Sequence, residues 1–172
     1  KIICDEIFGA TNYIDSISFD YESNNMNVSY ENNAPQGIMV SAGPEQLRRV
    51  LNNITGNALK YKVKEHGNIR IALSYKPHKP KKPLYRQINK DGTDINPPIK
   101  PDEFVRIEIS DDGPGISEKD LPNIFDRFFR ADASRNSAKR GSGLGLAIVK
   151  KIILDHRGKI WAKSTPGTGT SI

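Results

Sequence analysis

The sequence predicts an α/β sandwich in which one sheet packs against helices. Apolar and polar residues alternate over 69–75 and over 105–109, which is typical of strands. Residues 44–61 place apolar side chains on one face at the helical period. The length of 172 residues suits one domain with a sizeable core. Helices and strands that are mixed along the chain in this order favour a single sheet covered by helices.

The boundaries of the elements follow from apolar periodicity and from residues that start or stop helices. We expect helices over 4–17, 44–61 and 143–156, and strands over 26–30, 38–40, 69–75, 105–109 and 159–164. The second helix begins with Pro44, next to Ser41 or Gly43 as a cap. Gly158 ends the third helix, and Ile172 is expected to lie part-way along a final strand.

Composition and charge exclude several classes of protein. Apolar residues make up 36% of the chain and charged residues 27%, as in ordinary globular domains. The single cysteine, Cys4, excludes an intramolecular disulfide and a zinc site built from several cysteines, and indicates a reducing, intracellular setting. No apolar run approaches the roughly 20 residues that cross a bilayer, and no signal peptide opens the chain. The net charge of +6 suggests a phosphate-bearing or nucleic-acid partner.

Much of this charge lies in one proline-rich segment, residues 76–102. The segment holds six of the eleven prolines, and its seven basic residues against three acidic ones give it a net charge of +4. Because proline interrupts helices and central strands, we expect an exposed loop between the strands at 69–75 and 105–109.

The helix at 44–61 carries polar residues along one edge of its apolar face. At 100° per residue, Asn53, Asn57 and Lys60 fall together beside that face. A carboxamide oxygen is a suitable ligand for Mg²⁺ that already binds phosphates and water. Solvated asparagines without a function are the alternative reading of this helix alone.

Two glycine motifs follow. Asp111 and Asp112 end the strand at 105–109 and precede Gly113 and Gly115, so a carboxylate could accept a hydrogen bond from an exocyclic amine beside a flat ring. An ordinary Asp-Gly turn is the alternative. The second motif, at 141–146, opens the helix at 143–156, where backbone N–H groups could face a polyphosphate. It follows no strand pattern and lacks Gly-Lys-Ser/Thr, which excludes the Rossmann and Walker A motifs.

Between the glycine motifs lie a phenylalanine-rich segment and a polar one. Phe125, Phe128 and Phe129 favour burial, with at least two of them in the core, and Arg130 is a candidate phosphate contact. Residues 131–140 predict a mobile flap, whose cations could cover phosphates: Arg135, Lys139 and Arg140.

The order of these motifs resembles the catalytic and ATP-binding domain of sensor histidine kinases. These belong to the wider GHKL-type family that includes DNA gyrase, Hsp90 and MutL. The similarity extends over nearly the whole chain, to the Gly-Thr-Gly-Thr at 167–170. It implies a two-layer sandwich of a mixed, mostly antiparallel sheet and about three helices, the Bergerat-type ATP-binding fold. Residues 1–172 would form one domain of a longer protein, with 131–140 as the ATP lid.

The resemblance also implies site residues. It assigns Mg²⁺ to Asn57, with Asn53 beside it, and the adenine amine to Asp111. Catalysis would involve Asn53, Asn57, Lys60 and Arg130, the last of which approaches the γ-phosphate. Phe128 would anchor the lid. The remaining nucleotide-binding residues implied by the resemblance are Tyr61, Gly113, Gly115, Ile116, Gly141, Ser142, Gly143, Leu144, Gly145, Leu146 and Thr170.

One position favours phosphoryl transfer over hydrolysis. The gyrase and Hsp90 branch has a glutamate as general base where this chain has Asn53, and asparagine cannot accept a proton. The acceptor would be a histidine on a separate dimerisation hairpin, and the next partner a response regulator. His66, His78 and His156 read as structural or solvated. The parent is expected to be a homodimeric membrane sensor with this domain in the cytoplasm, and the domain alone a monomer.

Three alternatives stay open from the residues. One is a nucleotide-binding regulatory module that transfers no phosphate, and another is a gyrase- or Hsp90-type ATPase. The third is a nucleic-acid-binding protein that uses the basic loop. It is disfavoured because Tyr85 is the only aromatic residue of the loop.

Overall fold

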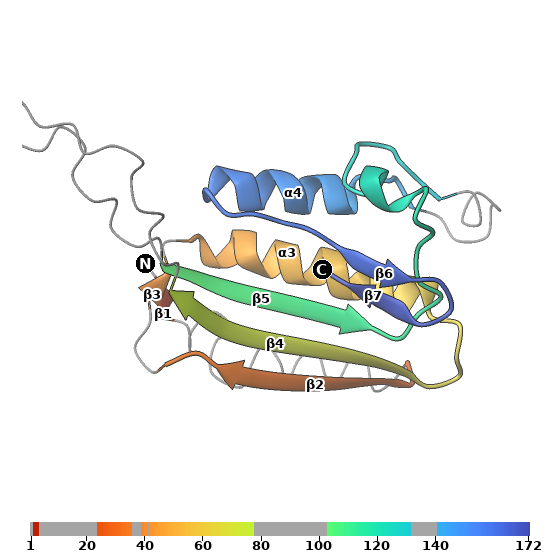
Figure 1. The fold of residues 1–172 in the computed structure, drawn as a ribbon, viewed down its shortest axis with the longest axis horizontal. Coiled ribbons are helices and arrows are strands. Elements are labelled where there is room, and N and C mark those ends of the chain that lie inside the picture. Colours follow the sequence, from red (N-terminus) through yellow and green to blue (C-terminus); the bar gives the residue numbers. More distant parts are fainter. Residues whose placement is uncertain (1, 4–23, 36–38, 41, 78–102, 132–140) are drawn as a thin grey trace, which may run out of the picture.

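The computed structural model describes residues 2–3, 24–35, 39–40, 42–77, 103–131 and 141–172. They form a five-stranded sheet of order β2-β4-β5-β7-β6 with two α-helices (Figure 1). The strands of this sheet are β2 (Met26–Asn33), β4 (Gly67–Pro77), β5 (Glu103–Asp111), β6 (Lys163–Thr165) and β7 (Gly169–Ser171). The helices are α3 (Pro44–Tyr61) and α4 (Gly145–Asp155), and a short 3-10 turn, η1, spans Leu121–Asn123. A separate pair joins β1 (Ile2–Ile3) to β3 (Met39–Val40).

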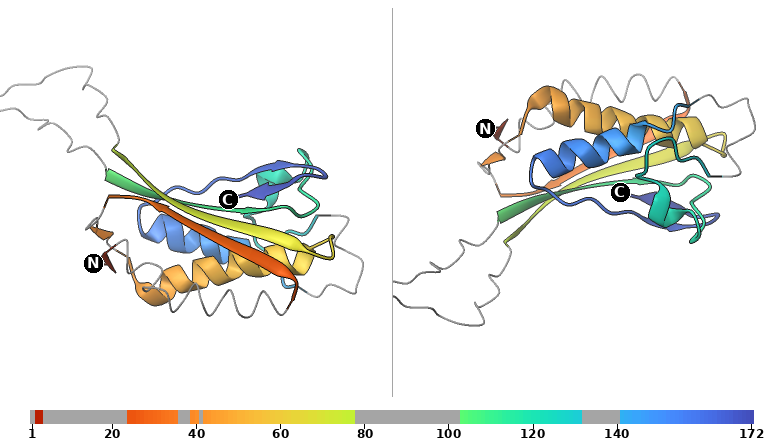
Figure 2. Two further views of the ribbon diagram at one scale, coloured as in Figure 1. Left: turned by 90° about the horizontal axis from the view of Figure 1, so that it is seen from below. Right: turned by 90° about the horizontal axis from the view of Figure 1, so that it is seen from above.

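The sheet is mixed and mostly antiparallel, as expected. β2 runs parallel to β4, and the other neighbours pair antiparallel. Both α-helices cover the same face of the sheet, which gives two layers (Figure 2). The described residues contain two α-helices rather than the expected three. The helix expected over 4–17 lies outside the described residues.

The core lies between the sheet and the helices α3 and α4, all of which contribute apolar faces. Alternate residues of β4 and β5 point to the helices because successive strand side chains face opposite sides. The buried side chains of this layer are Met26, Ile69, Ile71, Leu73 and Ile109. The helices contribute Leu47, Val50, Leu51, Ile54, Ala58, Val149 and Ile152. The predicted apolar face of 44–61 is therefore confirmed at the α3 positions Leu47, Val50, Leu51, Ile54 and Ala58.

Several boundaries differ from the sequence-based expectation. The strand expected over 159–164 is wrong at its start, since β6 begins at Lys163, opposite Ser171 of β7. The last helix begins at Gly145 rather than residue 143, because Gly143 has φ +69°, outside the helical region. The expected loop at 76–102 begins later, since β4 extends to Pro77, opposite Glu103. Residues 78–102 lie outside the described part of the chain.

Candidate functional site

The polar edge of α3 faces the N-terminus of α4. Asn53, Asn57 and Lys60 are all half-buried. Asn53 Nδ2 donates to the Arg49 carbonyl oxygen at 2.7 Å, which fixes the orientation of the amide. A Cβ added to Gly145 would lie 2.9 Å from Asn53 Oδ1, so the amide oxygen points at the first residue of α4. Glycine at this position leaves room between the two helices.

Lys60 lies against the second glycine motif. Its Nζ is 4.8 Å from the centre of the Tyr61 ring, a cation–π contact that holds the side chain. A Cβ at Gly141 would collide with the same Nζ. The structure thus places the end of α3, with Lys60 and Tyr61, next to Gly141 of the second glycine motif, which lies much later in the sequence.

The N-terminus of α4 has no side-chain cap. Leu144 is the N-cap residue and makes no side-chain hydrogen bond to the first turn. Gly141 and Ser142 are exposed, and the Ser142 hydroxyl accepts from the Leu144 N–H at 3.3 Å. The Leu146 side chain packs against the core, which fixes the first turn of α4 to the rest of the domain. An uncapped helix start next to a lysine is chemically suited to an anion.

Asp111 ends β5 on the face that is turned to the helices. It pairs with Ile69, a buried core residue, and its Oδ1 accepts the Gly113 N–H at 2.9 Å. Burial raises the pKa of the Asp111 carboxyl. The Gly113 and Thr170 N–H groups lower the pKa and the Asp112 charge raises it, with a net upward shift. The carboxylate can therefore accept a further hydrogen bond in a partly dry site.

The loop after Asp111 is held against the β6–β7 turn. Gly115 has φ +70°, and a Cβ there would collide with the Thr165 carbonyl oxygen. The Gly167 N–H donates to the Pro114 carbonyl oxygen at 2.7 Å, and the Ile116 N–H donates to Ser164 Oγ at 2.8 Å. Glycine at 115 is required by both its backbone angle and this close approach.

The phenylalanine segment contacts the second glycine motif through its backbone. The Phe128 N–H donates to the Gly143 carbonyl oxygen at 3.0 Å, and Phe128 itself has φ +63°. Phe128 is 71% exposed and neither Phe125 nor Phe129 is buried, so the expectation that at least two of the three lie in the core is wrong. A left-handed backbone at Phe128 aims the side chain away from the core. Phe125 and Phe129 are half-buried rather than core, and Ile124 is the buried residue of the segment.

The remaining predicted contacts lie at the edge of the described residues. Arg130 is half-buried, and Ala131 after it is the last described residue before residue 141. Arg135, Lys139 and Arg140, expected over the phosphates, lie outside the described residues.

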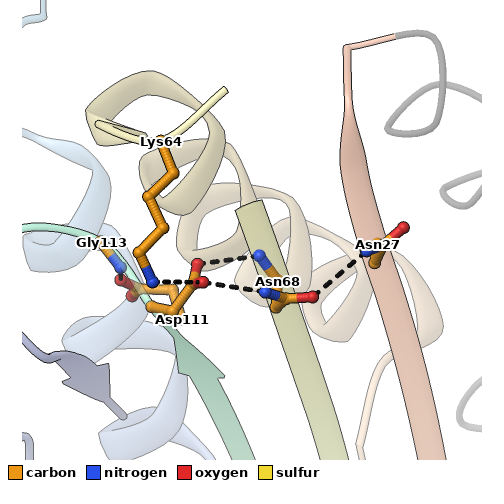
Figure 3. A network of polar contacts seen from close by, with 6 residues as sticks. Asn27, Lys64, Asn68, Asp111 and Gly113 are labelled. Atoms are coloured by element: carbon orange, nitrogen blue, oxygen red, sulfur yellow. Dashed lines mark hydrogen bonds and ion pairs between the residues drawn. The ribbon is translucent and has the colours of Figure 1, made fainter. Parts of the chain in front are cut away.

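A polar network that the sequence did not reveal ties the site to the rest of the sheet. Asp112 accepts three hydrogen bonds: from the Asn68 N–H at 2.8 Å, from Asn68 Nδ2 at 2.8 Å and from Lys64 Nζ at 2.9 Å. Asn68 Oδ1 in turn accepts from Asn27 Nδ2 of β2 at 3.3 Å. Figure 3 shows Lys64 and Asn68 reaching toward the end of β5, beside Asp111. The only sign of this network in the sequence was a second carboxylate, Asp112, next to Asp111, the residue that was predicted to bind the adenine amine.

The charge of Asp112 is stabilised by this network. Burial alone would raise the pKa of Asp112, but the hydrogen bonds from Asn68 and the ion pair with Lys64 outweigh it and lower the pKa to about 2. The network fastens the start of β4 and the connection after α3 to the strand end that carries Asp111.

The described residues lack both a cluster of metal-binding side chains and a membrane-spanning helix. Within them, no three His, Cys, Asp or Glu side chains gather as a metal site. None of their helices is long and apolar enough to cross a bilayer.

Comparison with known proteins gives one consistent family. Residues 42–172 match the family described as Histidine kinase-, DNA gyrase B-, and HSP90-like ATPase. Sensor histidine kinase WalK of Bacillus subtilis (strain 168) is 34% identical over 146 residues, which cover 84% of this chain and 20% of that protein. Sensor protein kinase WalK of Staphylococcus aureus (strain MRSA252) is 32% identical over 168 residues, or 97% of this chain and 24% of that protein. The chain therefore spans about a fifth to a quarter of these curated relatives.

Solved structures share the fold. The catalytic domain of histidine kinase ThkA superposes with a TM-score of 0.61 at 24% identity, over 96% of this chain and 84% of that one. The mycobacterial sensor histidine kinase MprB gives 0.63 at 23%, over 99% and 91% of the two chains. Full-length ShkA in complex with AMPPNP gives 0.62 at 22%, over 91% of this chain and 26% of that one.

Proposed function

The chain belongs to the family of histidine kinase-, DNA gyrase B- and HSP90-like ATPases, and we propose that it is the catalytic domain of a sensor histidine kinase. It binds Mg-ATP and transfers the γ-phosphoryl group to a histidine on a separate dimerisation hairpin. Residues 1–172 form one such domain. A response regulator receives the phosphoryl group from the histidine.

The observation that carries this proposal is the approach of α3 to the start of α4. Asn53 Oδ1 faces Gly145, and Lys60 Nζ lies against Gly141, at a helix N-terminus without a side-chain cap. Backbone N–H groups, the helix dipole and a lysine converge there, which is the chemistry that holds a polyphosphate. The glycines at 141, 143 and 145 let the chain approach the phosphates closely.

The adenine end of the nucleotide belongs at the end of β5. The Asp111 carboxylate, half-buried and oriented by the Gly113 N–H, accepts a hydrogen bond from the exocyclic amine. Gly113, Gly115 and Ile116 form the wall beside the ring, Thr170 lies next to Asp111, and Tyr61 lines the ribose side. Phe128 and Arg130 belong to the lid end, where Arg130 approaches the γ-phosphate.

Asn57 is the residue that would hold Mg²⁺. It lies one helical turn after Asn53 on the same half-buried edge, and a neutral amide oxygen suits a cation whose other ligands are phosphates and water. Mg²⁺ held there would supply positive charge that offsets the charge of the phosphates. Because Asn53 cannot take a proton from water, we expect slow hydrolysis and transfer to a presented histidine.

The relatives, sensor kinases of which this chain spans about a fifth to a quarter, support a proposal about the parent protein. We propose a homodimeric sensor that is anchored in a membrane, with this domain on the cytoplasmic side. The net charge of +6 of the 172-residue chain suits ATP as the anionic partner rather than nucleic acid.

Calorimetric titration of the 172-residue chain with ATP, with and without Mg²⁺, tests the site. Asp111→Asn is expected to weaken binding about tenfold or more under both conditions, because a donor amide replaces an acceptor. Asn57→Ala is expected to weaken only the Mg²⁺-dependent part. Asp155→Asn and Asn52→Ala, at exposed positions of α4 and α3, serve as matched controls.

Transfer of labelled phosphate to a supplied histidine-bearing hairpin tests the reaction. We expect transfer by the wild-type chain and its loss in Asn57→Ala. Wild-type affinities retained in both Asp111→Asn and Asn57→Ala would contradict the placement of the site. ATP binding without any transfer would contradict the kinase assignment and leave a nucleotide-binding module.

A further inference from the structure

We propose that Ser164 is a positioning residue that turns the Thr170 hydroxyl into a hydrogen-bond acceptor, and that the site thereby selects adenine over 6-oxopurines. This inference rests on the proposed nucleotide site and adds to it the residue that sets base selectivity. Ser164 lies in β6, outside both glycine motifs, and no sequence pattern pointed to it.

Three side chains form a row across neighbouring strands. Asp111 of β5 pairs with Thr170 of β7, and Thr170 pairs with Ser164 of β6. Directly opposed residues of antiparallel strands point to the same face of a sheet. Asp111 also pairs with the buried Ile69, so this row faces the helices and the proposed nucleotide site.

The Ser164 hydroxyl makes three contacts whose directions can be assigned. It lies 2.8 Å from the Gly169 carbonyl oxygen, which can only accept, so the single hydroxyl hydrogen of Ser164 is donated there. The Ile116 N–H, which can only donate, gives its hydrogen to Ser164 Oγ at 2.8 Å. The third contact joins Ser164 Oγ to Thr170 Oγ1 at 2.9 Å.

The contacts of Ser164 determine the direction of the Thr170 hydroxyl. Since Ser164 has no hydrogen left to give, Thr170 must donate to Ser164 Oγ, which fills the second lone pair of that oxygen. Thr170 Oγ1 then has lone pairs but no hydrogen to offer a ligand. Next to it lies the Asp111 carboxylate, which when ionised is also an acceptor.

Two neighbouring acceptors discriminate between purines at position 6. Adenine offers an exocyclic amine with two hydrogens, whereas hypoxanthine and guanine place a carbonyl oxygen there. An acceptor facing a carbonyl oxygen makes no hydrogen bond and leaves both oxygens unsatisfied, which a site built for a donor rejects strongly. A Thr170 hydroxyl free to rotate could instead donate to that carbonyl.

The experiment compares the affinities of the 172-residue chain for ATP and inosine triphosphate (ITP), which carries the 6-oxo group. We expect the wild-type chain to prefer ATP, and Ser164→Ala to lower the ATP:ITP affinity ratio about five- to tenfold, the worth of one hydrogen bond. Ser164→Thr keeps the hydroxyl and is expected to keep the ratio. In a Thr170→Val background, Ser164→Ala is expected to leave the ratio unchanged.

Ser171→Ala is the matched control. Ser171 follows Thr170 in β7, and its hydroxyl accepts a hydrogen bond from the Ser110 hydroxyl at 3.1 Å. Because successive side chains of a strand alternate, Ser171 faces the opposite side of the sheet from Thr170. We expect this variant to keep the wild-type ratio.

The outcomes separate selectivity from mere bracing of the loop. If Ser164→Ala weakens ATP and ITP binding equally, the residue is only structural and the inference is overturned. It is also overturned if the wild-type chain binds both nucleotides equally. Absence of ATP binding by the wild-type chain would overturn the proposed function as well, and is recognisable because no ratio can then be measured.

Discussion

Replacing Asp112 by asparagine removes the charge at the centre of the polar network and should destabilise the fold in a pH-dependent way. In the variant the amide nitrogen would face Asn68 Nδ2 and Lys64 Nζ, which are themselves donors. The folded chain holds the pKa of Asp112 at about 2, whereas an unfolded aspartate has a pKa of about 3.9. A depressed folded pKa means stability that is present above pH about 4 and lost as the pH falls toward 2.

The size of this effect follows from the pKa difference. The folded and unfolded pKa values of Asp112 differ by about two, which corresponds to at most about 3 kcal/mol of unfolding free energy. The side chains of Lys64 and Asp112 are 56% and 25% exposed, so solvent screens the ion pair and we expect about 1 kcal/mol.

Urea unfolding followed by circular dichroism, at pH 7 and in steps down to pH 3, measures the difference between the wild-type chain and Asp112→Asn. We expect about 1 kcal/mol at pH 7 and a progressive decrease below pH about 4. Asp126→Asn is the control, since its contact with Lys150 is 4.0 Å long and Asp126 is 60% exposed. A difference that stays constant from pH 7 to pH 3 would refute the role of the charge.

Two further substitutions test how the elements are joined. Gly143→Ala should cost about 2 kcal/mol or more of unfolding free energy, because φ is +69° and the new Cβ would lie 2.8 Å from Phe128 backbone atoms. Gly56→Ala, in open space within α3, should instead raise stability by up to about 1 kcal/mol, and equal losses in both would contradict the geometry. His156→Ala should cost about 1 kcal/mol, because Nε2 accepts the Gly43 N–H at 3.3 Å while Nδ1 donates to the Ile152 carbonyl oxygen at 2.7 Å. The exposed His66→Ala is its control, and both changes can be measured by urea unfolding; an effect no larger than that of His66→Ala would argue against the tie between α3 and α4.

Regular periodicity made much of the fold predictable. The helix expected over 44–61 has the same bounds as α3, because a proline start and an apolar stripe are local signals. The strand expected over 159–164 was misplaced, because β6 exists only where β7 supplies hydrogen bonds. The exposure of Phe128 was not predicted, because phenylalanine is ordinarily buried and rarely adopts the positive φ that it has here.

Motif order along the chain was enough to infer the family and to name Asn53, Asn57, Lys60 and Asp111 as candidates, because each is tied to a residue type and a short spacing. It was not enough to find Ser164 and Asp112 or the contacts that they make near the candidate site. Ser164 reaches Thr170, and Asp112 reaches Lys64 and Asn68, through strand register and chain reversal across tens of residues. Such contacts are set by how strands pair and helices pack, and no local pattern encodes that pairing.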